Sequence, residues 1–249
     1  MSGHNKWSNI QHRKGAQDAK KSKIFTKLIR ELTVAAREGG DPESNARLRS
    51  AIEKARDANM PKDKIETAIK KGTGELGGEE LFELMYEGYG PEGVALIISV
   101  VTNNKNRSAQ EVRHILSKHG GSLAESGAVA WNFEKKALIT IPKEEIADMD
   151  EFMMEAIEAG AEDVDDSTDP VEITAAPDAL GTVRDALKDK YTVKADLTYN
   201  PKTTVKLTGS PAEKLFKLLN ALEENDDVQN VYGNEDIDDE EMERIAENM

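Results

Sequence analysis

The side chains best suited to chemistry in this sequence are lysines and arginines close to its start. Residues 1–30 contain eight basic side chains and a single acid, Asp18. Ammonium and guanidinium groups bind phosphate through charge and hydrogen bonds, and nucleic acid is the commonest polymer of phosphates that a protein meets. The pattern therefore predicts contact with a nucleic-acid backbone.

A helix expected from about Asp18 to Glu38 positions part of this charge. At 100° per residue its apolar residues form one stripe, and only Val34 lies on the polar side. No acid occurs from Ala19 to Arg30, so ion pairs within the helix do not account for the basic residues there. We expect nucleic-acid contacts from Lys20, Lys23, Lys27 and Arg30.

Residues 1–17 lack periodicity and are expected to form an extended basic arm. The arm adds five candidate contact residues: Lys6, Trp7, His12, Arg13 and Lys14. An indole among basic groups is able to stack on an unpaired base while lysines hold phosphate. The alternative is that Trp7 docks onto its own helical domain, and the sequence leaves both open.

A second basic cluster lies between Asn103 and His119, where Lys105, Arg107 and Arg113 are candidate contacts. Ser108 is a plausible N-cap, and the helix N-terminus that it would open favours an anion. The alternative is that these cations form salt bridges with the many acids around them.

The charge of the chain is divided between its two ends. Residues 1–71 hold 17 Lys/Arg and 9 Asp/Glu, a net charge of +8. The whole chain has 33 and 48, which leaves 16 and 39 for residues 72–249, a net charge of −23. Such segregation attracts polyanions at one end and repels them at the other.

Composition narrows the class of protein. The chain of 249 residues has 38% apolar and 33% charged residues, which is typical of a soluble globular protein, and it contains no cysteine. Disulfides, thiol catalysis and cysteine-bound zinc are thereby excluded. No apolar run approaches the ~20 residues of a membrane span, and no signal peptide is recognisable, so we expect a cytoplasmic protein without a membrane partner.

The pattern of elements predicts an α+β protein of three domains. Three helices before residue 72 (the first at 18–38, the second beginning near Ser44, the third beginning at Pro61) form a basic three-helix domain at 18–72. Thr73–Gly78 is expected to be a hinge. Beyond it, short strands alternate with helices, including strands at 128–133 and 203–207. The order βαββαβ predicts a ferredoxin-like α/β domain at 135–199, inserted into a second ferredoxin-like α/β domain formed by 79–134 and 200–249.

No catalytic, metal or cofactor site is convincing. Gly72–Gly77 matches G-x-G-x-x-G but follows a helix, whereas a dinucleotide fingerprint follows a strand. Asp163–Asp169 resembles a calcium loop but lacks its glycine. His4 and His12 have no neighbouring ligands. We therefore expect no enzyme, no cofactor, no metal and no small-molecule substrate.

Several segments resemble the YebC family. They are Gly3–Trp7, His12–Lys14, Ala16–Ala19, Lys23–Lys27, Ile29–Glu31, Tyr86–Pro91, Asn104–Arg107, Glu111–His114, His119–Gly121 and Asp226–Gln229. The resemblance spans nearly the whole chain and implies a helical domain followed by two α/β domains. Members are described as DNA-binding transcriptional regulators. The mitochondrial relative is a translational activator for a cytochrome oxidase subunit, and some bacterial members resemble ribosome-associated factors that relieve stalls at proline runs.

Three functions remain open from the sequence. The favoured one is a translation factor that binds ribosomal RNA or tRNA on the ribosome, because long duplex DNA would bring phosphates near the acidic body within a Debye length of ~8 Å. The second is a transcriptional regulator that binds promoter DNA. The third, an enzyme acting on a phosphorylated small molecule, is motivated only by the glycine-rich hinge.

Overall fold

The computed structural model describes residues 17–248, with side chains for residues 21–247. Two compact units share these residues. The first comprises 17–132 and 201–248, and the second comprises 133–200. Among the described residues, no helix combines the length and apolar character needed to cross a membrane.

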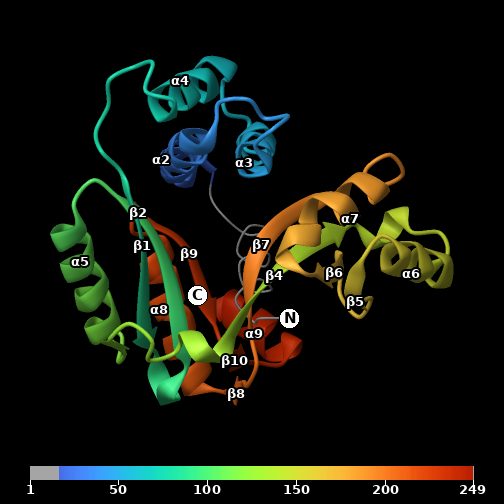
Figure 1. Cartoon of the computed structure of the whole chain (residues 1–249). Coiled ribbons are helices and arrows are strands. Elements are labelled where there is room, and N and C mark those ends of the chain that lie inside the picture. Colours follow the sequence, from blue (N-terminus) through green and yellow to red (C-terminus); the bar gives the residue numbers. More distant parts are fainter. Residues whose placement is uncertain (1–16, 249) are drawn as a thin grey trace. The chain divides into compact units, whose positions relative to one another are not determined.

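The first unit begins with the predicted three helices, α2 (Gln17–Ala35), α3 (Ala46–Asp57) and α4 (Lys62–Gly72), which group together in Figure 1. A 3₁₀ turn at Ala36–Glu38 completes the first helix. The N-cap of α3 is Asn45, one residue beyond the predicted Ser44. Its Oδ1 accepts from the Leu48 N–H (3.0 Å), and its amide donates to the Ala35 and Gly39 carbonyls. Asn45 therefore binds carbonyls at the end of the first helix and also caps the N-terminus of α3.

These helices share a small apolar core, as their periodicity predicts. Its buried members are Leu32, Ala35, Ala36, Leu48, Ala51, Ile52, Ala55, Met60, Ile65 and Ala68. Half of the ten are alanines, so the helices approach closely. Residues 73–81 connect α4 to the first strand without helix or strand structure.

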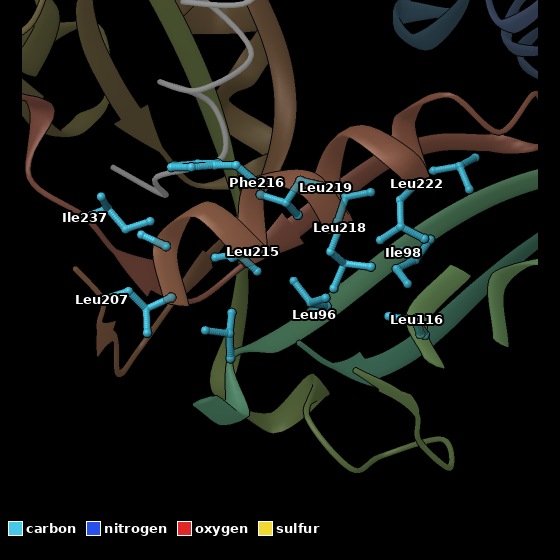
Figure 2. Packing of buried hydrophobic residues seen from close by; sticks show 14 of the residues in the cluster. Leu96, Ile98, Leu116, Leu207, Leu215, Phe216, Leu218, Leu219, Leu222 and Ile237 are labelled. Carbon is cyan, nitrogen blue, oxygen red and sulfur yellow. The ribbon is translucent and has the colours of Figure 1, made fainter. Parts of the chain in front are cut away.

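The rest of the first unit is built on a four-stranded antiparallel sheet of order β3-β1-β2-β9. Its strands are β1 (Phe82–Tyr89), β2 (Ala95–Thr102), β3 (Ser122–Leu123) and β9 (Val228–Gly233). Helices α5 (Lys105–Lys118) and α8 (Ser210–Glu223) pack against one face. Figure 2 shows the leucines of α8 above Leu96 and Ile98 of β2, with Leu116 of α5 beside them. The predicted return of a late helix and strand to this domain is therefore confirmed at β9.

The strand predicted at 128–133 is wrong. Residues 124–132 form a loop that ends in a 3₁₀ turn at Ala130–Asn132, and strand β4 begins only at Phe133. The buried carboxylate of Glu87 accepts the N–H groups of Gly127, Val129 and Ala130, so these donors are not available to a neighbouring strand.

The strand predicted at 203–207 is shorter than expected and pairs elsewhere. It is reduced to β8 (Val205–Lys206), which pairs in parallel with β10 (Glu235–Asp236) and does not join the main sheet. The acidic tail then forms a terminal helix, α9 (Asp239–Asn248). Met242, Ile245 and Ala246 of α9 are buried in the main core.

The second unit has the predicted ferredoxin-like order βαββαβ. Its elements are β4 (Phe133–Ile141), α6 (Met149–Glu158), β5 (Ala161–Asp165), β6 (Val171–Ala175), α7 (Leu180–Leu187) and β7 (Lys194–Pro201). The sheet order is β5-β6-β4-β7, so each βαβ crossover leaves room for one intervening strand. A mixed α+β architecture is thus confirmed.

Candidate nucleic-acid interface

Part of the predicted interface lies outside the described residues. This applies to the arm residues Lys6, Trp7, His12, Arg13 and Lys14 and to the side chain of Lys20. Their contact with nucleic acid stays a prediction. The structure bears on the remaining candidates, which lie on α2 and α5.

Three cations of α2 point toward the end of α8. Lys27 Nζ donates to the carbonyl oxygen of Glu223 (2.6 Å), and Lys23 Nζ donates to that of Glu224 (3.3 Å). Arg30 donates to the carbonyls of Asp226 and Val101. The last carbonyls of a helix lack partners within the helix and carry partial negative charge, so cations stabilise them. The lysines of α2 thus cap α8.

The side chain of Asp227 joins α2, β2, α5 and β9. Its Oδ1 accepts from Arg30 (2.7 Å), and its Oδ2 accepts from Arg107 of α5 (2.8 Å) and from the Thr102 hydroxyl (2.9 Å). The residue is only 2% exposed. We call Arg30, Thr102, Arg107 and Asp227 the Asp227 cluster.

Burial of Asp227 by itself would raise the pKa of its carboxyl group. Hydrogen bonds from Arg107 and Thr102, with the charges of Arg30 and Arg107, outweigh burial and lower that pKa below its ordinary value. Asp227 is therefore ionised at neutral pH and balances two guanidinium groups. The cluster holds the three-helix domain to the α/β domain.

The pKa of Lys27 is also affected by the contact between α2 and the end of α8. Burial lowers the pKa of its ammonium group, while the charges of Glu223 and Asp226 act to raise it. Lys27 and Arg30, from which we expected contacts to nucleic acid, are thus engaged by acceptors within the protein. Lys23 remains exposed despite its contact with Glu224.

The three candidates on α5 have different surroundings. Lys105 lies over the ring of Phe82, with Nζ 4.1 Å from the ring centroid, and Arg107 belongs to the Asp227 cluster. Arg113 is exposed on the outer surface of the helix. The alternative of internal salt bridges thus applies to Arg107.

Ser108 is not the N-cap of α5. The helix begins at Lys105, and the cap is Asn104, whose Oδ1 accepts from the Arg107 N–H (3.1 Å). Ser108 is a buried residue of the first turn of α5, so the helix N-terminus lies at Asn104 and not at Ser108. The prediction of Ser108 was wrong because Asn104, a residue equally suited to capping, lies four residues earlier and begins the helix there.

Several cations of the three-helix domain remain exposed. Lys21 and Lys64 lie over the ring of Phe25, with each Nζ less than 6 Å from its centroid. The exposed cations among the described residues of this domain are Lys21, Lys23, Arg37, Arg56, Lys62, Lys64, Lys70 and Lys71. A basic surface therefore remains after the internal contacts of α2 are formed.

Sequence reasoning missed the junction between α2 and the α/β domain, although one signal marked it. Val34 is the apolar residue on the polar side of α2, and it is only 2% exposed without belonging to the three-helix core. An apolar residue in line with Lys27 and Arg30 indicates that this face of the helix is covered. Asp227 itself gives no such signal, because nothing local marks its partners.

The described residues contain no cluster of three or more His, Cys, Asp or Glu side chains able to hold a metal ion. The Asp227 cluster places the Thr102 hydroxyl beside a carboxylate. Its carboxylate already accepts hydrogen bonds from two guanidinium groups and a hydroxyl. The arrangement is suited to joining domains.

Two models of known protein families match this chain. Residues 5–75 match the TACO1/YebC protein N-terminal domain, and residues 81–235 match the TACO1/YebC second and third domain. The chain belongs to the TACO1/YebC family. The resemblance seen in the sequence is thereby confirmed, with the three-domain organisation of the family.

Relatives of this TACO1/YebC chain align along its whole length. Proteins from Petrotoga mobilis and Kosmotoga olearia are 72% and 62% identical to it, and in both pairs 100% of each chain is covered. Each is named "Probable transcriptional regulatory protein". The crystal structure of a conserved hypothetical protein from Aquifex aeolicus is similar, with a TM-score of 0.81 and 47% identity over 89% of this chain and 93% of that one.

Proposed function

We propose that this protein is a non-enzymatic regulator of gene expression that binds RNA and acts in the cytoplasm on the ribosome. The observation that carries the proposal is the separation of charge, +8 in residues 1–71 against −23 in the rest. Exposed cations on α2, α3 and α4 support it, because they remain after Lys27 and Arg30 have been engaged internally. The basic arm adds further charge to the same end.

We propose two different roles for the candidate contact residues. Lys6, Trp7, His12, Arg13, Lys14 and Lys20, with exposed Lys23, Lys105 and Arg113, are proposed to contact RNA. Lys27, Arg30 and Arg107 are better explained as the residues that hold the domains together, since each donates a hydrogen bond of 2.8 Å or less to an acceptor within the protein.

RNA is favoured over long duplex DNA for an electrostatic reason. A straight duplex lying across the three-helix domain would extend past the acidic body, and like charges within about 8 Å repel at physiological salt. A folded RNA such as ribosomal RNA or tRNA can receive the basic end while the acidic body stays outside it. Relief of stalling or activation of translation is the corresponding role.

Transcriptional regulation is the second candidate function. It is favoured by the names of relatives that are 62–72% identical to this chain along their full length. It requires contact with promoter DNA through the basic end alone. A specific complex would show a preference of about 10³-fold or more for the promoter over random duplex.

Co-sedimentation with ribosomes at about 150 mM salt tests the proposal. Replacing Lys6, Arg13 and Lys14 by Glu should lower the bound fraction at least tenfold, because three phosphate contacts become three repulsions. The control replaces the exposed Lys214 and Lys217 of α8 by Glu, a change of the same kind outside the basic end, and should leave binding unchanged. Full binding by the arm variant would contradict the proposal.

Crosslinking followed by sequencing separates the two candidates. The proposal predicts that the attached nucleic acid is ribosomal RNA or tRNA. Enrichment of promoter DNA, together with a footprint that is absent from scrambled duplex, would replace it with transcriptional regulation.

A further inference from the structure

Two aromatic side chains of the first unit are presented to solvent at one place. Trp131 of the 124–132 loop is 66% exposed, and Tyr89 at the end of β1 is 37% exposed. The Trp131 Nε1–H donates to the Ala128 carbonyl (2.9 Å), and the Tyr89 hydroxyl donates to the same oxygen (3.3 Å). One carbonyl thus fixes the polar edges of both rings, and their apolar surfaces remain open to solvent.

The loop that carries Trp131 is held from beneath by Glu87. The carboxylate is 7% exposed and accepts three backbone N–H groups, from Gly127 (2.7 Å), Val129 (2.7 Å) and Ala130 (2.8 Å). Burial would raise the pKa of Glu87, but these three bonds lower it. The carboxylate of Glu87, two residues before Tyr89 on β1, is therefore bound by internal donors, and its repulsion of a phosphate is reduced.

The backbone of Lys202 is held next to Asn132, the residue that follows Trp131. The Lys202 N–H donates to the Asn132 carbonyl (2.7 Å), and the Asn132 side chain accepts from both the N–H (3.0 Å) and the hydroxyl (2.8 Å) of Thr203. These bonds fix residues 202–203 against the residue that follows Trp131. The Lys202 side chain is exposed there.

We propose that Trp131 and Tyr89 stack on unpaired bases of a single-stranded RNA segment and that Lys202 binds its backbone. This inference rests on the proposed function and adds a base-binding site far in sequence from the basic arm. Stacking needs a flat apolar ring and a nearby cation, and it tolerates any base, because every base has a π face.

The size of the patch favours a base over a protein partner. An aromatic side chain buries about 150–250 Å² at most, whereas each partner of a stable protein interface contributes about 800 Å². Two partly exposed rings provide a fraction of that area. They match the faces of one or two bases.

Fluorescence tests the site directly, because the chain has two tryptophans, Trp7 and Trp131. In the Trp7→Phe variant, Trp131 is the sole indole. Titration with an unlabelled single-stranded uridine oligonucleotide should quench its fluorescence, whereas the corresponding duplex RNA should quench it much less. Binding of a labelled oligonucleotide is followed in parallel by anisotropy.

Substitution gives a second readout. Trp131→Ala should weaken binding of the uridine oligonucleotide by about 5- to 150-fold, the range for loss of one stacked base. Trp131→Phe should restore most of the affinity, because a flat ring is retained. The matched control, Met154→Ala, removes an apolar side chain that is 61% exposed in the second unit and should have no effect.

The outcomes separate this site from the proposed function. Stacking is overturned if the Trp131→Ala variant binds RNA normally and RNA does not quench the fluorescence of the Trp7→Phe variant. If the arm variant loses binding in the same experiments, the proposed function stands. If no variant or wild-type protein binds RNA or ribosomes, both fail. Equal quenching by duplex RNA, or concentration-dependent quenching without RNA, would show that another ligand or a second copy occupies the rings.

Discussion

At the scale of single residues, Asp227 is the buried carboxylate that connects α2 to the α/β domain. It is 2% exposed and accepts from Arg30, Thr102 and Arg107. A buried carboxylate is stabilising only when its charge and lone pairs are matched, and here two guanidinium groups and a hydroxyl match them. The two arginines come from different domains, so the same residue supports both the fold of the α/β domain and its contact with α2.

We expect Asp227→Asn to lower the free energy of unfolding by about 2–3 kcal/mol. Hydrogen bonds to charged groups contribute about 1.5–3 kcal/mol, and both arginines are partly exposed, so the loss should not exceed that of a fully buried pair. Urea denaturation measures the change. Asp226→Asn is the matched control at an exposed neighbour and should change stability by less than about 0.5 kcal/mol. Equal effects of the two substitutions would contradict the role assigned to Asp227.

Asp227 should also make stability depend on pH in the acid range. Because its pKa is lower in the folded protein than in the unfolded chain, its contribution is present above about pH 4 and is lost as the pH falls through the folded-state pKa. Asp227→Asn lacks this contribution. The stability difference between wild type and variant should be constant between pH 5 and 7 and shrink below about pH 4. A difference that persists undiminished into strong acid in urea titrations would exclude this linkage.

At the scale of elements, α2 is covered on two sides. Leu32, Ala35 and Ala36 face the three-helix core, while Val34 is buried elsewhere. Lys27 contacts the last residue of α8, and Arg30 contacts residues that follow it. The close approach of α4 to α2 depends on Gly72. A Cβ atom at this position would lie 2.2 Å from the Thr33 carbonyl oxygen and 2.7 Å from the Ala36 Cβ. The glycine read from the sequence as a helix end is thus a packing residue.

Gly72→Ala should destabilise the protein by about 1–3 kcal/mol, the usual cost of an atom forced into a packed contact. Gly78→Ala is the control in the same connection, since its Cβ would meet nothing nearer than 3.9 Å. Its unfolding free energy should stay close to that of wild type. Thermal and urea unfolding of the two variants make the comparison, and an unchanged Gly72→Ala protein would disprove the close contact of α2 with α4.

At the scale of the whole molecule, the separation of charge serves two purposes. Some cations of residues 1–71 make contacts within the protein, namely Lys27 and, in the Asp227 cluster, Arg30. The exposed remainder of the three-helix domain, with the arm, is available to an external polyanion. Affinity for RNA should therefore depend on salt according to the exposed cations alone.

The salt dependence gives a quantitative test. For single-stranded nucleic acid the slope of log K against log salt is about −0.7 for each phosphate contact. Replacing Lys6, Arg13 and Lys14 by Ala should reduce its magnitude by about 2, whereas the exposed pair Lys214 and Lys217 replaced by Ala should leave it unchanged. Binding isotherms between about 50 and 200 mM salt measure it. Equal slopes for all three proteins would show that the arm makes no phosphate contact.

The sequence alone determined the features that depend on nearby residues. Helical periodicity located α2, α3 and α4, the order of elements predicted the ferredoxin-like unit, and counting charges revealed the basic end. The sequence did not determine which cations have partners within the folded protein. Arg30 and Arg107 find their partner 197 and 120 residues away, and Glu87 converts a predicted strand into a loop by binding donors 40–43 residues later. Such pairs form only when the chain folds, because the free energy of a buried charge depends on which groups surround it and not on its neighbours in sequence.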